Sequence, residues 1–326
     1  MAAPPIRFAP RSDFHAELKA EVEASLAEGG RDRHATFALH FKTAFLLVGL
    51  ASVVSVALLV PLSWPGVVAL GLVLGFFIAG IGFNIMHDAN HGSYSRRPWV
   101  NKVLGATLDL LGGSSRLWRV KHNQVHHHWT NIEGVDDDID VGFLGRMSPT
   151  QTWRRAHRFQ HLYFWPPWLP GHQVALVRRL LPDRPRQDLV PARSAPGRRR
   201  LGAVDPGKVV FMWAFALPIA VMGAAKGIAF YVVAQLFMGV TLAVVFQLAH
   251  CVEAAGFHPL SAGPVPVDFA RHQLASTVDF AGGNRLVTWY VGGLNHQAVH
   301  HLFPTISHAH SPTSRLSWRG WPRSMA

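Results

Sequence analysis

The chain has 326 residues, and 49% of them are hydrophobic. Its 31 lysines and arginines exceed its 19 aspartates and glutamates, which gives a formal net charge of +12. The basic residues lie outside the long apolar runs, a distribution that favours contact with lipid headgroups or an acidic protein and excludes nucleic acid as a partner. The single cysteine, Cys251, excludes an internal disulfide framework and a cysteine-ligated iron–sulfur cluster, and we expect it to serve in packing.

The first predicted element is an amphipathic helix over residues 13–28, with Ser12 as its N-cap. Residues 1–42 are polar and charged, so we expect no cleavable signal peptide there. The apolar face of the predicted helix consists of Phe14, Leu18, Val22 and Leu26.

Four long apolar runs predict transmembrane helices, because a hydrocarbon core of roughly 30 Å needs about 20 helical residues. Short links at Ser63-Trp64 and at Lys226-Gly227 predict two tight hairpins. Lysine and arginine concentrate in the N-terminal segment, in residues 87–207 and in the C-terminal tail, which predicts that both termini and the central segment face the cytoplasm. The four runs cover residues 43–62, 65–86, 208–225 and 228–249.

The central segment carries weaker signals. Residues 101–118 predict a short amphipathic helix interrupted at Gly112-Gly113. The tryptophan- and arginine-rich residues 153–181 are typical of a segment that lies in the membrane interface plane. The proline- and arginine-rich residues 182–206 predict a loop that returns to the membrane.

Three histidine clusters follow or lie between the apolar runs. Residues four apart on a helix share a face, so each spaced pair could grip one metal ion, and an adjacent histidine can reach a second ion. The last apolar run ends at His250, which could complete the set. The clusters are His87 with His91, His122 with His126 and His127, and Gln297 with His300 and His301.

Spacing alone does not make a metal site, and the chain contains its own control. His157 and His161 are also four apart but lie in the interfacial segment without a partner cluster, so we expect a structural role. His128 is expected at the surface or behind the ligands. The acidic run that contains Asp136 and Asp138 lacks the spacing of a calcium loop and predicts a solvated loop or support for histidine ligands.

The ligand types narrow the choice of metal. Imidazole suits zinc, copper, iron and nickel. About eight imidazoles exceed the four ligands that one zinc ion needs, so they favour a dinuclear site. Iron is the natural metal if the task is oxygen activation.

In their order and spacing these motifs resemble those of the membrane fatty-acid desaturases, specifically a bacterial acyl-CoA or acyl-lipid branch similar to the front-end desaturases. The matching patterns are His-x-x-x-His, His-x-x-x-His-His and Gln-x-x-His-His, and the glutamine marks the front-end branch. The similarity runs from about residue 8 to His310, which predicts a single domain over residues 1–310. The resemblance implies an all-α integral membrane protein of the bacterial inner membrane, with four transmembrane helices in two hairpins and a cytoplasmic helical cap that holds a di-iron site.

The resemblance also implies the ligands and the reaction. Two Fe ions and O2 would remove two hydrogens from adjacent acyl carbons and release water. His296 and Gln297 compete for one coordinating place, and we favour Gln297. Supporting residues beside the ligands are expected to be Asp88, Asn123 and Asn295. The implied iron ligands are His87, His91, His122, His126, His127, His250, His300 and His301.

The expected partners are the lipid bilayer, a fatty acyl-CoA or acyl-lipid substrate and a separate electron donor. No His-Pro-Gly-Gly haem motif precedes residue 13, so the electrons are expected from an acidic ferredoxin-like carrier with its reductase. The closest alternative is a related histidine-box oxygenase, either an alkane or sterol hydroxylase or a carotenoid ketolase. A metal transporter is disfavoured because the apolar runs contain essentially no ionisable residues before their terminal histidines.

Residues 311–326 depart from the resemblance. They show no amphipathic period where the family continues with a helix, so we expect a shifted reading frame or a truncated variant. Sequencing the coding DNA tests this expectation: an intact frame, with this tail present in the mature protein, would contradict it.

Overall fold

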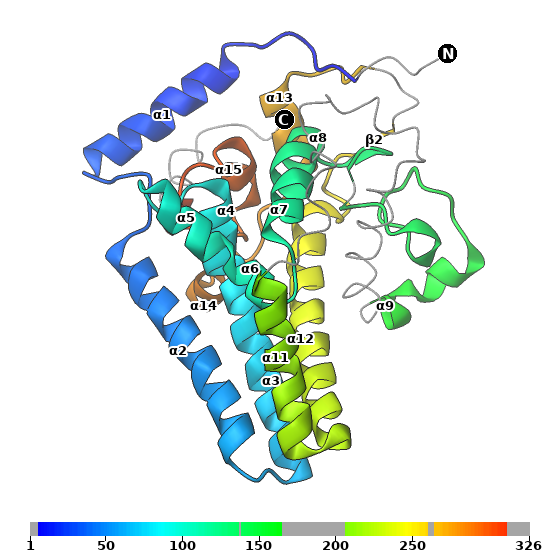
Figure 1. The fold of residues 1–326 in the computed structure, drawn as a ribbon. Coiled ribbons are helices and arrows are strands. Elements are labelled where there is room, and N and C mark those ends of the chain that lie inside the picture. Colours follow the sequence, from blue (N-terminus) through cyan, green and yellow to red (C-terminus); the bar gives the residue numbers. More distant parts are fainter. Residues whose placement is uncertain (1–5, 137, 165–205, 260–263, 312–326) are drawn as a thin grey trace.

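The protein is mostly helical, and the computed structural model describes residues 6–136, 138–164, 206–259 and 264–311 (Figure 1). Long helices form a bundle that carries a cap of short helices at one end (Figure 1). The atypical tail from residue 312 onward and most of the predicted interfacial segment and loop, residues 165–205, lie outside the described residues. The bundle helices are α2 (Phe37–Leu59), α3 (Trp64–Ile81), α11 (Pro206–Met222) and α12 (Ala224–His250).

Among the described residues, three helices are long and apolar enough to cross a membrane. They are α2, the continuous helix Trp64–His91 and α12. The helix Trp64–His91 joins α3 to the π-helix η1 (Gly82–Met86) and to α4 (His87–His91). The predicted run at residues 208–225 corresponds to α11, whose apolar part, Val209–Met222, is shorter than the other three spans.

Local signals explain where the bundle helices begin. The Thr36 side chain accepts a hydrogen bond from the Leu39 backbone N–H, so α2 begins six residues before the predicted residue 43. Ser63 caps α3 in the same way, and Pro65 stands in its first turn. The second link was predicted at Lys226-Gly227, which is wrong. The chain turns at Gly223, whose φ of 82° favours glycine, and Lys226 lies inside α12, where its Nζ donates to the Leu62 carbonyl at 2.6 Å.

Helices α3 and α12 approach closely because glycine leaves no side chain between them. A Cβ at Gly71 would lie 2.9 Å from the Phe230 carbonyl oxygen, and one at Gly75 would lie 2.6 Å from that of Ala234. Small residues four apart allow this kind of backbone contact between membrane helices. Val67 and Leu74 complete the apolar core of this contact.

The cap contains three short helices where a single one was predicted over residues 101–118. They are α5 (Pro98–Gly105), α6 (Thr107–Leu110) and α7 (Ser115–Trp118). The predicted interruption at Gly112-Gly113 is confirmed, since Gly112 has a φ of 92°, but the break at Ala106 was missed. The chain continues into a second π-helix, η2 (Arg119–His126), and then α8 (His127–Trp129).

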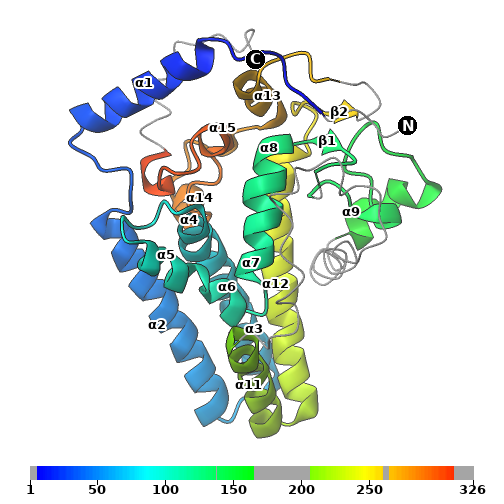
Figure 2. The same ribbon diagram turned by 45° about the horizontal axis from the view of Figure 1, so that its top comes forward.

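The rest of the cap consists of short elements. A two-residue parallel pair joins β1 (Ile132–Glu133) to β2 (His258–Pro259). One arm, which lies beside α12 in both views (Figures 1 and 2), contains η3 (Gly142–Leu144), η4 (Arg155–Phe159) and α9 (Gln160–Tyr163). The remaining elements are α13 (Phe269–Ser276), α14 (Arg285–Tyr290), α15 (Gln297–Leu302) and η9 (His308–His310).

Helix α1 (Phe14–Glu28) covers the cap, as Figure 2 shows. Its predicted apolar face is confirmed: Phe14, Leu18, Val22 and Leu26 are buried against α13 and α15. The predicted cap at Ser12 is wrong. The Ser12 hydroxyl donates to Asp268 Oδ2 at 2.6 Å, and it therefore ties the start of α1 to α13.

Candidate metal centre

The first two histidine motifs lie at or beside π-helical turns. The three histidine groups of the sequence are called motifs one (His87 and His91), two (His122, His126 and His127) and three (Gln297, His300 and His301). Motif one lies in α4, directly after η1, and motif two lies in η2 and at the start of α8. A π-turn places residues five apart above each other, so His122 and His127 share a face, and their Nε2 atoms lie 3.2 Å apart. The α-helical geometry expected from the sequence would instead pair His122 with His126.

The first cluster gathers His87, His91, His122 and His300, with one ring nitrogen from each within 4.8 Å of the others. The ring centroid of His87 lies 4.7 Å from that of His91 and 4.5 Å from that of His300. Three distant segments of the chain therefore meet at one point. All four histidines of this cluster are predicted ligands.

The second cluster gathers His126, His250 and His301 under the same distance limit. The rings lie 4.7 to 5.0 Å apart between centroids. His127 belongs to neither group but lies between them, with its ring 4.3 Å from that of His301 and 4.7 Å from that of His91. A third, overlapping group joins His122 and His126 to Asp138.

Each imidazole of the second cluster donates a hydrogen bond from Nδ1. His126 donates to Asp136 Oδ2 at 3.0 Å and His301 donates to Gln273 Oε1 at 2.9 Å. His250 donates to the Ser276 carbonyl at 3.3 Å. A ring that donates from Nδ1 offers the lone pair of Nε2, which is how proteins orient histidine ligands.

The histidines fit a bound metal. Among the described residues, the buried Nε2 atoms of His91, His126, His300 and His301 have no hydrogen-bond partner. Unpaired buried polar atoms are costly, and a metal ion at each cluster would satisfy these nitrogens.

The protonation states of most of these rings agree with this fit, because metal binding requires neutral imidazole, and His126 is the exception. Burial lowers the pKa of His122 to about 3 and holds the pKa values of His127, His300 and His301 well below the ordinary value. Burial also disfavours the charged form of His126, but the charges of Asp136 and Asp138 outweigh it and raise the pKa of that ring. The two carboxylates therefore make the surroundings of the His126 ring negative.

Of the two competing residues of motif three, Gln297 reaches the second cluster. Its amide Nε2 lies 2.9 Å from His250 Nε2. His296 is buried at the N-cap of α15 and belongs to none of the groups of convergent nitrogens found among the described residues.

The three predicted supporting residues differ in what they touch. Asp88 Oδ1 lies 3.6 Å from His87 Nδ1, and its Oδ2 lies 2.9 Å from His308 Nδ1. Asn123 donates to the Asn90 carbonyl at 2.9 Å and so supports the backbone of motif one. Asn295 donates to the Thr288 hydroxyl at 2.9 Å, which supports the turn before motif three rather than a ligand.

Three contributors to this centre were not predicted from the sequence. Gln273, Ser276 and His308 carry no spacing signal, because each acts through contacts far along the chain. The acidic run was predicted to be a solvated loop or to support histidine ligands. The contact of Asp136 with His126 agrees with the second prediction.

The control histidines lie outside both clusters, as expected. His157 accepts from the Arg154 backbone N–H and binds the Phe143 carbonyl. His128 is exposed. Cys251 packs in an apolar cluster with Ile139 and Met147, as predicted.

Candidate membrane spans that lead into buried histidine clusters define a helical membrane protein able to bind metal through imidazole. Residues 62–317 match the family model described as fatty acid desaturase. The chain belongs to the fatty acid desaturase family, and it is an oxidoreductase that desaturates fatty acyl chains.

Named relatives support this assignment over most of the chain. A sn-1 linoleoyl-lipid 6-desaturase of Arthrospira platensis is 36% identical over 314 residues, which cover 94% of this chain and 84% of that protein. A sn-1 linoleoyl-lipid 6-desaturase of Synechocystis is 32% identical over 328 residues, covering 96% and 88%. An acyl-lipid (8-3)-desaturase of Physcomitrium patens is 36% identical over 253 residues, covering 73% and 51%.

Proposed function

We propose that the protein introduces a cis double bond into an acyl chain of a membrane glycerolipid, with O2 as the oxidant and two iron ions as the cofactor. The two buried histidine clusters are the observation that carries this proposal. The lipid-linked substrate is favoured over acyl-CoA because the relatives from Arthrospira platensis and Synechocystis are named for lipid-linked linoleoyl groups.

His87, His91, His122 and His300 would hold one ion, and His126, His250 and His301 the other, with Gln297 beside His250 and His127 between the two. Bound iron would supply the redox chemistry that activates O2. Asp136, Gln273 and the Ser276 carbonyl fix the ring orientations.

Aromatic side chains around the ligands exclude water. The Trp118 ring stacks on His122 with centroids 4.2 Å apart, and the Phe246 ring lies 5.0 Å from that of His250. A dry site strengthens electrostatic interactions and protects reactive species from side reactions with solvent.

The proposed topology has four spans in two hairpins, in which α11 crosses the membrane in addition to the three longer helices. The cap and both termini would face the cytoplasm of a bacterial cell. The basic residues of the cap and the short turn at Gly223 support this arrangement. Electrons would come from a separate acidic carrier that docks on the basic cytoplasmic face.

Expression in a host without desaturases, followed by mass spectrometry of its fatty acids, tests the function. We expect products that have lost two hydrogens when the host is supplied with linoleate. His301→Ala should abolish them, whereas His161→Ala, which changes an exposed histidine outside both clusters, should not. Products that instead gain an oxygen atom would overturn desaturation in favour of the hydroxylase alternative.

A further inference from the structure

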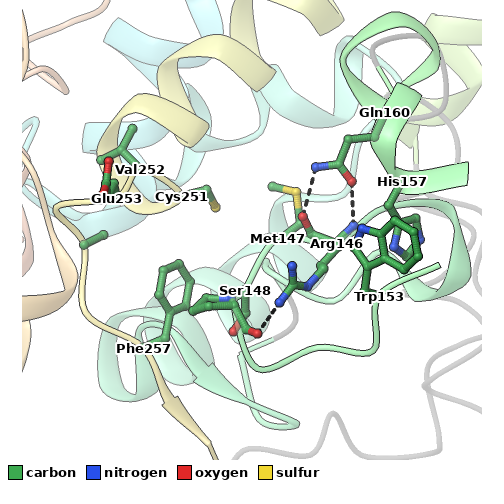
Figure 3. A pocket seen from close by; sticks show the side chains of 12 residues that line it. Arg146, Met147, Ser148, Trp153, His157, Gln160, Cys251, Val252, Glu253 and Phe257 are labelled. Carbon is green, nitrogen blue, oxygen red and sulfur yellow. Dashed lines mark hydrogen bonds between the residues drawn. The ribbon is translucent and has the colours of Figure 1, made fainter. Parts of the chain in front are cut away.

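A cavity of about 430 Å³ opens beside the cytoplasmic end of α12, between the residues after His250 and the arm that contains η3, η4 and α9 (Figure 3). Its volume lies in the range typical of small-molecule sites. Arg146, Trp153 and Cys251 are among its lining residues.

The floor of this cavity adjoins the second histidine cluster. Cys251 directly follows His250, and it packs with Met147 and Phe246 in one apolar cluster. The Phe246 ring lies 5.0 Å from the ring of His250 and 5.7 Å from that of His126. A thin layer of apolar side chains therefore separates the cavity from two predicted iron ligands.

Arg146 brings a positive charge into the cavity. Its guanidinium donates from Nε to the Gln151 carbonyl at 2.9 Å and from Nη2 to the Pro149 carbonyl, and it forms no ion pair with an acidic side chain of the described residues. Glu253 also lines the cavity, but Figure 3 shows it on the opposite side from Arg146. The two hydrogen bonds of Arg146 leave Nη1 and the second Nη2 hydrogen of the partly buried guanidinium to donate to phosphate oxygens.

The rim of the cavity is suited to a bilayer surface rather than to water. The same arm exposes large apolar side chains, with 72% of Phe143, 55% of Trp153 and 69% of Leu162 accessible. Arg154, Arg155 and Arg158 are exposed between them. Exposed aromatic and aliphatic groups mixed with cations are typical of segments that lie in an anionic lipid interface.

We propose that this cavity binds the head-group phosphate of a glycerolipid through Arg146. The inference rests on the proposed function, because a fixed head group beside the second cluster would hold the acyl chain at a set distance from the iron. Such an anchor would select the carbon to be oxidised by counting from the carboxyl end. Coenzyme A also carries phosphates, but the apolar rim favours a lipid source.

Calorimetric titration of the purified full chain in detergent tests the proposal. Three soluble probes distinguish the sources: dihexanoyl phosphatidylglycerol, a galactosyl diacylglycerol with the same chains, and hexanoyl-CoA. We expect phosphatidylglycerol to bind tightest and Arg146→Gln to weaken its binding at least about tenfold. Arg146→Lys should retain part of the affinity, and Arg31→Gln, which changes an exposed arginine far from the cavity in sequence, should bind as the wild type does.

Three results would overturn the proposal: phosphatidylglycerol binding unchanged in Arg146→Gln, galactolipid binding as tight as phosphatidylglycerol binding, or an Arg146 effect confined to hexanoyl-CoA. Melting temperature and metal content show whether Arg146→Gln is folded. If it is not folded, the binding affinity of Arg146→Lys is compared with that of the wild type instead. Binding does not require turnover. A wild-type protein that binds phosphate through Arg146 but makes no unsaturated product would contradict the proposed function alone.

Discussion

The contact between His126 and Asp136 is a fully enclosed interaction behind a predicted iron ligand. Asp136 is 0% exposed, and its Oδ2 accepts both from His126 Nδ1 at 3.0 Å and from the Asn131 backbone N–H at 2.9 Å. The carboxylate therefore fixes the ring and the start of the following turn together. Carboxylate–histidine pairs of this kind also increase the basicity of the ligand.

Replacing Asp136 with leucine should weaken metal binding by about 10- to 100-fold, because the ring loses its acceptor. Metal retained against increasing chelator, measured by mass spectrometry, reports this loss. Asp140→Leu is the matched control, since Asp140 accepts from the Gly142 backbone in a partly exposed loop. Equal retention in Asp136→Leu and the wild type would show that the carboxylate does not support a ligand.

At the residue scale, the sequence identifies the histidines that form the two clusters better than it identifies the residues that contact them. His87 and His91 are recognisable because helical spacing places them on one face. Gln273 could not be recognised, because it reaches His301 across 28 residues, and at Ser276 the acceptor is a backbone carbonyl that any residue could supply.

At the scale of elements, a buried lysine joins the helices that precede motifs one and three. Lys42 of α2 donates from Nζ to Asn84 Oδ1 and to the Trp289 carbonyl, each at 2.7 Å. Asn84, in η1, donates in turn to the Tyr290 carbonyl at 2.9 Å. The network ties α2, η1 and α14 together where the chain enters the metal centre.

Lys42→Met should destabilise the protein by about 1–3 kcal/mol, because it removes the donor from the buried Asn84 Oδ1 and from the partly buried Trp289 carbonyl. Thermal unfolding in detergent measures the effect. Lys102→Met, at an exposed position of α5, provides the control and should melt like the wild type. If both variants melted alike, the network would be dispensable.

The three candidate spans among the described residues were predictable because each depends on a local apolar run. The finer boundaries were not: the helix expected over residues 101–118 divides at Ala106, and the second hairpin turns at Gly223 rather than at residues 226–227. The π-helix η2 was also not predicted, since no local sequence pattern indicates a π-helix. It pairs His122 with His127 and divides His122 and His126 between the two clusters.

At the scale of the whole molecule, the centre depends on segments that meet only in the folded chain. His300 and His301 are adjacent, yet their rings lie nearly perpendicular at 87° and enter different clusters. The sequence indicates two metal ions but not which histidines share one, because that division depends on how α15 lies against α4, η2 and α12.

The positive charge of the whole chain predicts how it receives electrons. Turnover with an acidic carrier should fall as salt rises from 0.1 to 1 M, since the Debye length shrinks from about 10 Å to about 3 Å. Steady-state rates at several salt concentrations measure this effect, with a small uncharged chemical reductant as the control. Rates that do not depend on salt would argue against electrostatic docking.

The number of iron ions that the chain binds distinguishes a centre of two metal ions from any other arrangement of these histidines. Protein purified from iron-replete cells should contain about two iron ions per chain by elemental mass spectrometry, and His161→Ala should keep them. His250→Ala removes one of the three imidazoles of the second cluster and should lower the count. A wild-type chain that desaturates lipid with one iron ion or none would contradict the two-cluster centre.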